Sequence, residues 1–181
     1  MLKKALIVID YTYDFVADDG RLTCGRPGQD IAPKITSLIE DYIKDGELVV
    51  FTNDIHYEGD PYHPETKLFP PHNIAGTAGR ELYGSVKDAY EKYADVCLSL
   101  DKTRYSSFAG TNLHQLLQER GIREIALVGV CTDICVLHTA VDAYNLGYKL
   151  SIYKDGVASF NEIGHNWALG HFSGTLGAEV I

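Results

Sequence analysis

The chain has 181 residues, 45% of them hydrophobic, and a formal net charge of −9. This length predicts one compact domain rather than two, and the composition excludes a disordered chain. The negative charge argues against binding to nucleic acid or to an anionic membrane surface, because both need a basic protein surface, and it favours a small-molecule partner.

Short apolar runs recur along the chain and predict strands. Five of them cover residues 5–9, 48–51, 96–100, 125–130 and 150–153. Their short, unbroken character is typical of strands that are buried on both faces of a sheet. Residues 178–181 are expected to add a short sixth strand.

Apolar residues at helical spacing lie between these runs. One stripe from Ile35 to Ile43 and another from Leu113 to Leu117 predict helices. A third helix is predicted to begin near Asp133. Its inward face is expected to consist of Val136, Ala140, Ala143 and Tyr144. Strand and helix therefore alternate, which predicts an α/β fold with an open, mostly parallel six-stranded sheet and helices on both faces.

Residues 54–80 interrupt this alternation. The segment contains four prolines and three histidines and shows no helical periodicity. A loop this long within a compact domain is usually functional. We therefore predict a single domain over residues 1–181 with a metal-binding loop at about residues 54–80.

The four cysteines, Cys24, Cys97, Cys131 and Cys135, do not form a tandem metal knuckle. No apolar run approaches the roughly 20 residues that cross a membrane, and the first residues do not resemble an export signal, so we expect a cytoplasmic protein whose cysteines remain thiols. Cys131 lies four residues before Cys135. A redox pair of Cys131 and Cys135 is therefore an alternative, although their spacing is not the Cys-x-x-Cys spacing of thiol oxidoreductases.

Polar side chains follow the predicted strands at the edge where ligands of open α/β sheets gather. Asp10 follows the first strand, Lys102 the third and Cys135 the fourth. Taken singly, they also fit a turn-capping aspartate, a surface lysine and a buried structural cysteine. Together they predict a nucleophilic thiol with a nearby base and a nearby cation. The thiol is expected near a helix N-terminus, which favours thiolate and offers backbone amides to an oxyanion.

The long loop contains residues that suit a metal ion. Asp54 and His56 lie two residues apart in an extended segment, so both side chains point to the same side. The loop can return Glu65 and His72 to them, and His63 competes with Glu65 for the last position. Mixed nitrogen and oxygen ligands suit zinc, manganese or iron. A solvated loop without metal is the alternative.

With these residues the chain resembles the isochorismatase-like cysteine hydrolases, and within them the bacterial nicotinamidases, also called pyrazinamidases. The resemblance covers nearly the whole chain. Its landmarks are residues 5–10, 52–56, 68–72 and 102–108, and the most specific element is Gly129-Val-Cys-Thr-Asp-Ile-Cys-Val136.

The resemblance implies a role for each matching position. Asp10, Lys102 and Cys135 would form a catalytic triad. Asp54, His56 and His72 would bind one divalent transition metal, with zinc favoured over manganese or iron and Glu65 as a further ligand. The peptide bond between Val130 and Cys131 would be cis, and the backbone amides of Cys131 and Cys135 would form an oxyanion hole.

The implied activity is hydrolysis of nicotinamide, and of pyrazinamide, to the acid and ammonia through a thioester, as a step of NAD salvage. The metal would bind the ring nitrogen, and Phe15, Phe69 and Tyr105 are expected to line the ring pocket. A carbamoyl-amide hydrolase of the same superfamily and a noncatalytic zinc-binding α/β module are the alternatives. Association into a homo-oligomer is compatible with the sequence.

Overall fold

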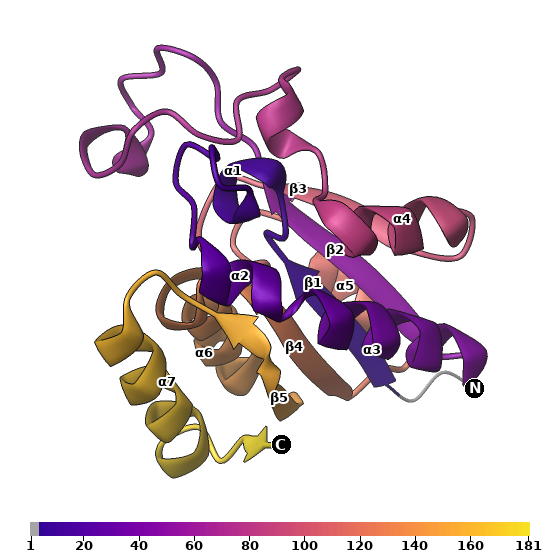
Figure 1. The fold of residues 1–181 in the computed structure, drawn as a ribbon. Coiled ribbons are helices and arrows are strands. Elements are labelled where there is room, and N and C mark those ends of the chain that lie inside the picture. Colours follow the sequence, from indigo (N-terminus) through magenta and orange to yellow (C-terminus); the bar gives the residue numbers. More distant parts are fainter. Residues whose placement is uncertain (1–3) are drawn as a thin grey trace.

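In the computed structural model, which describes residues 4–181, parallel strands form an open sheet with helices on both faces (Figure 1). The sheet has six strands in the order β3-β2-β1-β4-β5-β6, and every neighbouring pair is parallel. The strands are β1 (Lys4–Ile9), β2 (Leu48–Asp54), β3 (Leu98–Lys102), β4 (Glu124–Val130), β5 (Lys149–Ala158) and β6 (Glu179–Val180). The predicted fold class is confirmed.

The two faces of the sheet carry separate hydrophobic clusters. Side chains of β1 alternate between them, with Ile7 on one face and Leu6 and Val8 on the other. The face of Ile7 is covered by α5 (Leu113–Glu119), α6 (Leu137–Asn145) and α7 (Glu162–Gly174), and the other by α3 (Ala32–Lys44) and α4 (Gly84–Lys92). Because both faces are buried, the central strands β1 and β4 are apolar along nearly their whole length.

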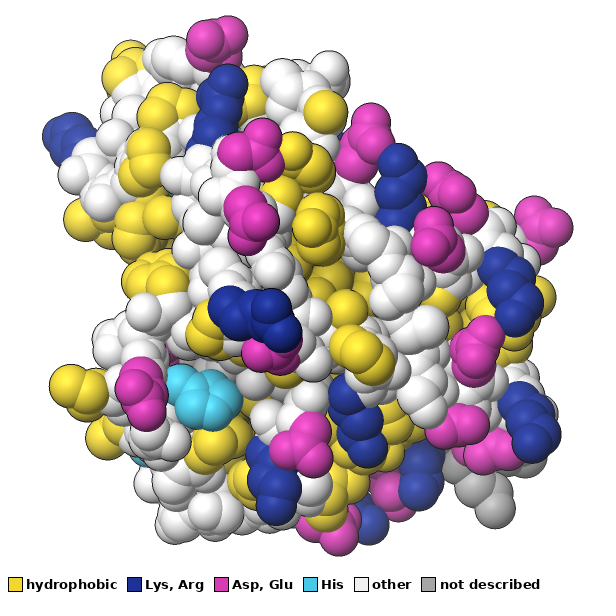
Figure 2. All heavy atoms as spheres, in the orientation of Figure 1, with side chains coloured by type: hydrophobic (Ala, Val, Ile, Leu, Met, Phe, Trp, Pro, Cys, Tyr) yellow, Lys and Arg dark blue, Asp and Glu magenta, His cyan; other side chains and the backbone are white. Residues whose placement is uncertain are grey.

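Shorter elements surround the carboxyl ends of the strands. They are the helices α1 (Tyr13–Val16) and α2 (Arg26–Asp30), the 3₁₀ turns Pro64–Lys67 and Ala78–Arg80, and a π-helical turn, Thr132–Val136. The long loop after β2 extends beyond this edge of the sheet (Figure 1). On the face shown in Figure 2, lysine and arginine side chains are interspersed with acidic ones. Within residues 4–181, none of the helices is long and apolar enough to cross a membrane.

Some element boundaries differ from the prediction. The third strand begins at Leu98 rather than Val96, whose side chain is 59% exposed, and it ends at Lys102. Pairing with β2 explains the shift, because the register opposes Asp54 to Lys102 and includes both in the sheet. β5 also continues past the predicted run to Ala158, with an irregularity opposite Leu127–Gly129.

The inward face of α6 was predicted correctly except for Tyr144. Val136, Ala140 and Ala143 are buried, whereas Tyr144 is 52% exposed. Residue 144 follows the buried Ala143 directly and is turned about 100° away from it on the helix. The prediction that Tyr144 faces inward is therefore wrong. Two longer helices, α4 and α7, were not predicted at all.

Candidate active site

The candidate site is built where the carboxyl ends of the central strands meet. Asp10 follows β1 directly, Asp54 and Lys102 are the last residues of β2 and β3, and Cys135 lies in the π-helical turn after β4. All four side chains are buried. Because the strands are parallel and adjacent, residues far apart in sequence come together at this edge.

Lys102 forms the electrostatic centre of this group. Its Nζ lies 2.7 Å from Asp10 Oδ2, and it also donates to Asp54 Oδ1. Burial alone would lower the pKa of Lys102, but the charges of Asp10 and Asp54 outweigh it and hold this pKa well above its ordinary value. The buried ammonium is therefore charged and paired on two sides, which offsets the cost of removing it from water.

Asp10 is held beside Lys102 by the backbone. Its Oδ1 accepts a hydrogen bond of 2.7 Å from the Asp54 amide, and its own φ is +53°. Burial, together with the nearby charge of Asp54, raises the pKa of Asp10 to about 6, against the opposing effect of Lys102. A carboxylate with a pKa this close to neutrality is suited to accept and return a proton.

Cys135 lies against these carboxylates. One side-chain atom each of Asp10, Asp54 and Cys135 lies within 4.8 Å of the others. Burial raises the pKa of Cys135 well above its ordinary value, although Lys102 opposes the shift. The expected preference for thiolate at the helix N-terminus is therefore outweighed by burial, and the thiol needs a neighbouring base to become a nucleophile.

The turn that carries Cys135 is fixed by its surroundings. A Cβ at Gly129, where φ is +116°, would lie 2.0 Å from the Ile9 carbonyl oxygen, so only glycine fits there. The peptide bond between Val130 and Cys131 is cis, as the sequence resemblance implies. Thr132 Oγ1 lies 2.8 Å from His165 Nδ1. This contact ties the turn to His165 of α7.

Ser159 provides a second support for the same turn. Its hydroxyl donates a 2.6 Å hydrogen bond to Asp133 Oδ1. The Asp133 carboxylate also packs against Gly164 at the start of α7, where a Cβ would lie 2.0 Å from Oδ2. Sequence reasoning missed both contacts, because each joins polar residues from elements that are adjacent only in the folded chain.

The candidate metal ligands form a second buried cluster. Ligand atoms of Asp54, His56, Glu65 and His72 all lie within 4.8 Å of one another. His56 Nε2 is 3.8 Å from Asp54 Oδ2, and His72 Nε2 is 3.5 Å from Glu65 Oε2. The loop thus brings together the four residues that the sequence singled out.

The polar atoms of this cluster test whether a metal fits. Asp54 Oδ2, His56 Nε2, Glu65 Oε1 and His72 Nε2 are buried and have no hydrogen-bond partner within residues 4–181. Buried polar atoms normally have a partner, so these four unpaired atoms, aimed at one another, suit a shared cation. His72 Nδ1 lies 2.8 Å from the Pro70 carbonyl oxygen, which leaves Nε2 free for a metal.

His63 was the competing candidate for the fourth ligand position. Its Nδ1 accepts a hydrogen bond of 3.2 Å from the Glu65 amide, and its Nε2 lies 2.8 Å from the Thr103 carbonyl oxygen. Both ring nitrogens are therefore engaged with the backbone. This arrangement places Glu65, and not His63, among the clustered ligand atoms.

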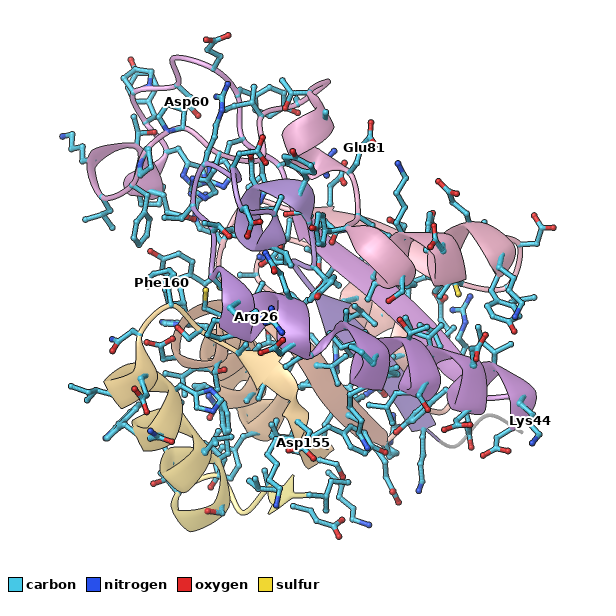
Figure 3. All side chains as sticks on the ribbon, in the orientation of Figure 1. Arg26, Lys44, Asp60, Glu81, Asp155 and Phe160 are labelled. Carbon is cyan, nitrogen blue, oxygen red and sulfur yellow. The ribbon has the colours of Figure 1, made fainter. Side chains whose placement is uncertain are left out.

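A small cavity is lined by residues of both groups. Cys131, Cys135, Asp54 and Glu65 all line it. The three aromatic residues predicted for the pocket, Phe15, Phe69 and Tyr105, all line it. Sequence reasoning missed three further lining residues, Leu22, Ile134 and Phe160. Phe160, labelled in Figure 3, follows β5 and is 45% exposed at the cavity.

Comparison with known proteins defines the class. The model of the isochorismatase domain matches residues 4–181, and the chain therefore belongs to this family. It is 57% identical over 181 residues to the uncharacterized isochorismatase family protein PncA of Bacillus subtilis, covering 99% of both chains.

Two solved structures resemble the chain over its length. The pyrazinamidase/nicotinamidase from Streptococcus mutans UA159 is 52% identical, with a TM-score of 0.96 over 99% of this chain and 100% of that one. The pyrazinamidase of Pyrococcus horikoshii in complex with zinc is 27% identical, with a TM-score of 0.85 over 99% of this chain and 98% of that one.

Proposed function

We propose that this protein is a nicotinamidase, which hydrolyses nicotinamide to nicotinate and ammonia and also accepts pyrazinamide. The observation that carries the proposal is that one small cavity is bordered both by Cys135 and by the candidate metal ligands Asp54 and Glu65. A single aromatic ring with a carboxamide can then reach the thiol and the metal position together. The similar chain from Streptococcus mutans, named a pyrazinamidase/nicotinamidase, supports the same substrate.

The proposed metal site consists of Asp54, His56, Glu65 and His72. Its mixed oxygen and nitrogen donors suit one divalent transition metal, with zinc favoured over manganese or iron. The zinc complex of the Pyrococcus horikoshii pyrazinamidase supports this choice. When bound, the metal supplies a Lewis-acidic position for the ring nitrogen of the substrate.

The proposed reaction begins with proton transfer from Cys135 to Asp10. The raised pKa of the buried thiol makes this transfer necessary, and the near-neutral pKa of Asp10 makes it accessible. Lys102 orients Asp10 through their 2.7 Å ion pair and stabilises the negative charge as the sulfur attacks the carboxamide carbon. The backbone amides of Cys131 and Cys135 are proposed to hold the oxyanion.

The second half of the reaction uses Asp10 again. It donates its proton to the leaving nitrogen, so that the C–N bond breaks, ammonia leaves and a thioester to Cys135 remains. Asp10 then accepts a proton from water, which attacks the thioester; the C–S bond breaks, nicotinate leaves, and Asp10 returns the proton to the Cys135 sulfur. Phe15, Phe69 and Tyr105 would hold the ring and exclude bulk water. We place this reaction in the cytoplasm, where nicotinate can be returned to NAD.

The direct test measures ammonia release from nicotinamide by the purified, metal-loaded protein. Stoichiometric formation of ammonia and nicotinate supports the proposal. Protein that is folded and metal-loaded but releases no ammonia from nicotinamide or pyrazinamide would contradict it, and would favour a noncatalytic zinc-binding module. Release of ammonia from small carbamoyl compounds instead would favour the related carbamoyl-amide hydrolases.

A further inference from the structure

Two cysteine thiols outside the proposed triad lie in contact with each other. Cys24 Sγ and Cys131 Sγ are 3.3 Å apart, although 107 residues separate them in the sequence. Cys24 belongs to the loop between α1 and α2, and Cys131 is the first residue after β4. Both side chains are buried, with exposures of 5% and 4%. The fold therefore holds two free thiols together at the edge of the candidate site.

The two thiols differ in their access to small molecules. Cys131 lines the cavity that Cys135 also borders, and Cys24 does not belong to the described residues that line it. The backbone amide of Cys24 donates a 2.8 Å hydrogen bond to the Phe15 carbonyl oxygen, which fixes the backbone of this residue. A small molecule that enters the cavity thus meets Cys131 first.

We propose that Cys24 and Cys131 form an oxidisable dithiol site, which a small hydroperoxide entering the cavity converts to a disulfide that reversibly lowers turnover. The proposed function uses neither thiol group, since its only role for Cys131 is through the backbone amide. The pair is also distinct from the Cys131–Cys135 redox pair that the sequence left open, because Cys24 is the partner that lies in contact with Cys131.

The chemistry balances with hydrogen peroxide as the oxidant. The Cys131 sulfur attacks one peroxide oxygen, the O–O bond breaks, and a sulfenic acid and one water form. The Cys24 sulfur then attacks the Cys131 sulfur, the S–O bond breaks, and a second water leaves as the disulfide forms. The two thiols lose two electrons and two protons. A hydrogen bond with Cys24 and burial raise the pKa of Cys131, so we expect this thiol to react slowly with peroxide.

The disulfide should affect turnover through the backbone. An S–S bond is about 2.05 Å long, so the two sulfurs must approach each other by more than 1 Å from their separation of 3.3 Å. Cys131 follows the cis peptide bond, and its amide belongs to the proposed oxyanion hole. Displacements on the order of 1 Å at a catalytic group reduce rates by up to about 100-fold, and we expect a loss of about tenfold here.

The experiment treats the reduced, metal-loaded protein with hydrogen peroxide, blocks the remaining thiols with iodoacetamide and digests it without reductant. Mass spectrometry should find a peptide pair linked through Cys24 and Cys131, two hydrogens lighter than the separate peptides. In the same sample Cys135 should be found in its iodoacetamide-alkylated form, which shows that peroxide left it as a free thiol. Nicotinamide hydrolysis should fall about tenfold as the linked pair accumulates, and dithiothreitol should restore it.

Two variants serve as controls. Cys24→Ser should keep the basal activity, form no linked pair, and retain a dimedone-reactive sulfenic acid on Cys131 after peroxide. Cys97→Ser should behave as the wild type. The proposal is overturned if the wild type yields no Cys24–Cys131 link, if Cys131 pairs with Cys135 instead, or if fully linked protein keeps its turnover. Because the link is read by mass, it can form even if nicotinamide is not the substrate.

Discussion

Asp54 and Lys102 join the metal cluster to the proposed catalytic group. One carboxylate oxygen of Asp54 contacts the Lys102 ammonium, while the other lies 3.8 Å from His56 Nε2. The pairing of β2 with β3 creates this contact, because its register places the two residues opposite each other. Lys102 continues the connection to Asp10. The contact of Asp54 with Lys102 therefore links the residues that would bind the metal to those that would attack the amide.

Replacement of Cys135 by alanine should abolish amide hydrolysis while the fold is retained. Alanine fills most of the buried space of the cysteine but offers no nucleophile, so we expect a loss of at least about 1,000-fold in kcat. Ammonia release measures the loss, and circular dichroism checks the fold. Cys97→Ser is the matched control and should leave turnover unchanged. Activity of the Cys135→Ala variant within tenfold of the wild type would show that the thiol is not the nucleophile.

The reactivity of Cys135 in the chelator-treated protein should increase steeply with pH. Burial raises the pKa of this thiol well above its ordinary value, so it is protonated at neutral pH and only the small thiolate fraction reacts. Below the pKa, that fraction grows about tenfold per pH unit. Iodoacetamide labelling of Cys135, followed by mass spectrometry between pH 7 and 9, should show this slope. A rate that is already constant over this range would mean a lowered pKa and would contradict the expectation.

The proposed metal site predicts one divalent metal ion per chain. Elemental analysis of the purified protein should find zinc, or manganese or iron in its place. The variant His72→Ala removes one of the four clustered ligand atoms. Alanine offers no donor atom in its place, so this variant should lose most of the metal. His171→Ala, on α7, is the matched control. Full metal content in the His72→Ala protein would show that the cluster is assigned incorrectly.

The structure brings the predicted candidate residues together at one edge of the sheet, whereas several predictions for the surrounding elements needed correction. Asp10, Lys102 and Cys135 could be placed because each follows or ends an apolar run, and parallel strands bring their carboxyl ends to one edge. The helix that carries Tyr144 was found, but the width of its buried face was overestimated by one residue. A hydrophobic pattern indicates that a helix has a buried side, whereas the neighbouring elements decide how wide that side is.

Contacts between distant polar residues could not be predicted in this way. Glu65, rather than His63, lies among the clustered ligand atoms, because backbone hydrogen bonds engage both ring nitrogens of His63. The support of Thr132 by His165 and the contact of Cys24 with Cys131 join segments that no local pattern connects. Periodicity reports burial along one element, but these pairings depend on how the loops and α7 are folded against the sheet.

Gly129 should tolerate no side chain. A Cβ at this position would lie 2.0 Å from the Ile9 carbonyl oxygen, and the φ of +116° is strained for any other residue. Gly129→Ala should therefore lower the free energy of unfolding by at least about 3 kcal/mol or prevent folding. Gly170→Ala is the matched control, because a Cβ there meets nothing within 4 Å and alanine favours the helix by up to about 1 kcal/mol. Urea unfolding monitored by circular dichroism compares the two, and equal midpoints would contradict the predicted clash.

Benzamide tests whether the metal position selects the substrate. It keeps the aromatic ring and the carboxamide of nicotinamide but lacks the ring nitrogen, so it can reach Cys135 without offering a ligand to the cluster of Asp54, His56 and His72. If the nitrogen binds the metal, its loss leaves a buried coordination position to water, which should cost several kcal/mol and lower kcat/KM by at least about 100-fold.

The His72→Ala variant provides the complementary measurement. With little metal bound, it should hydrolyse nicotinamide poorly and should lose its preference over benzamide. Equal kcat/KM for both amides in the metal-loaded wild type would remove the metal from substrate recognition and leave the cysteine mechanism intact, because Asp10, Lys102 and Cys135 act only on the carboxamide that the two compounds share.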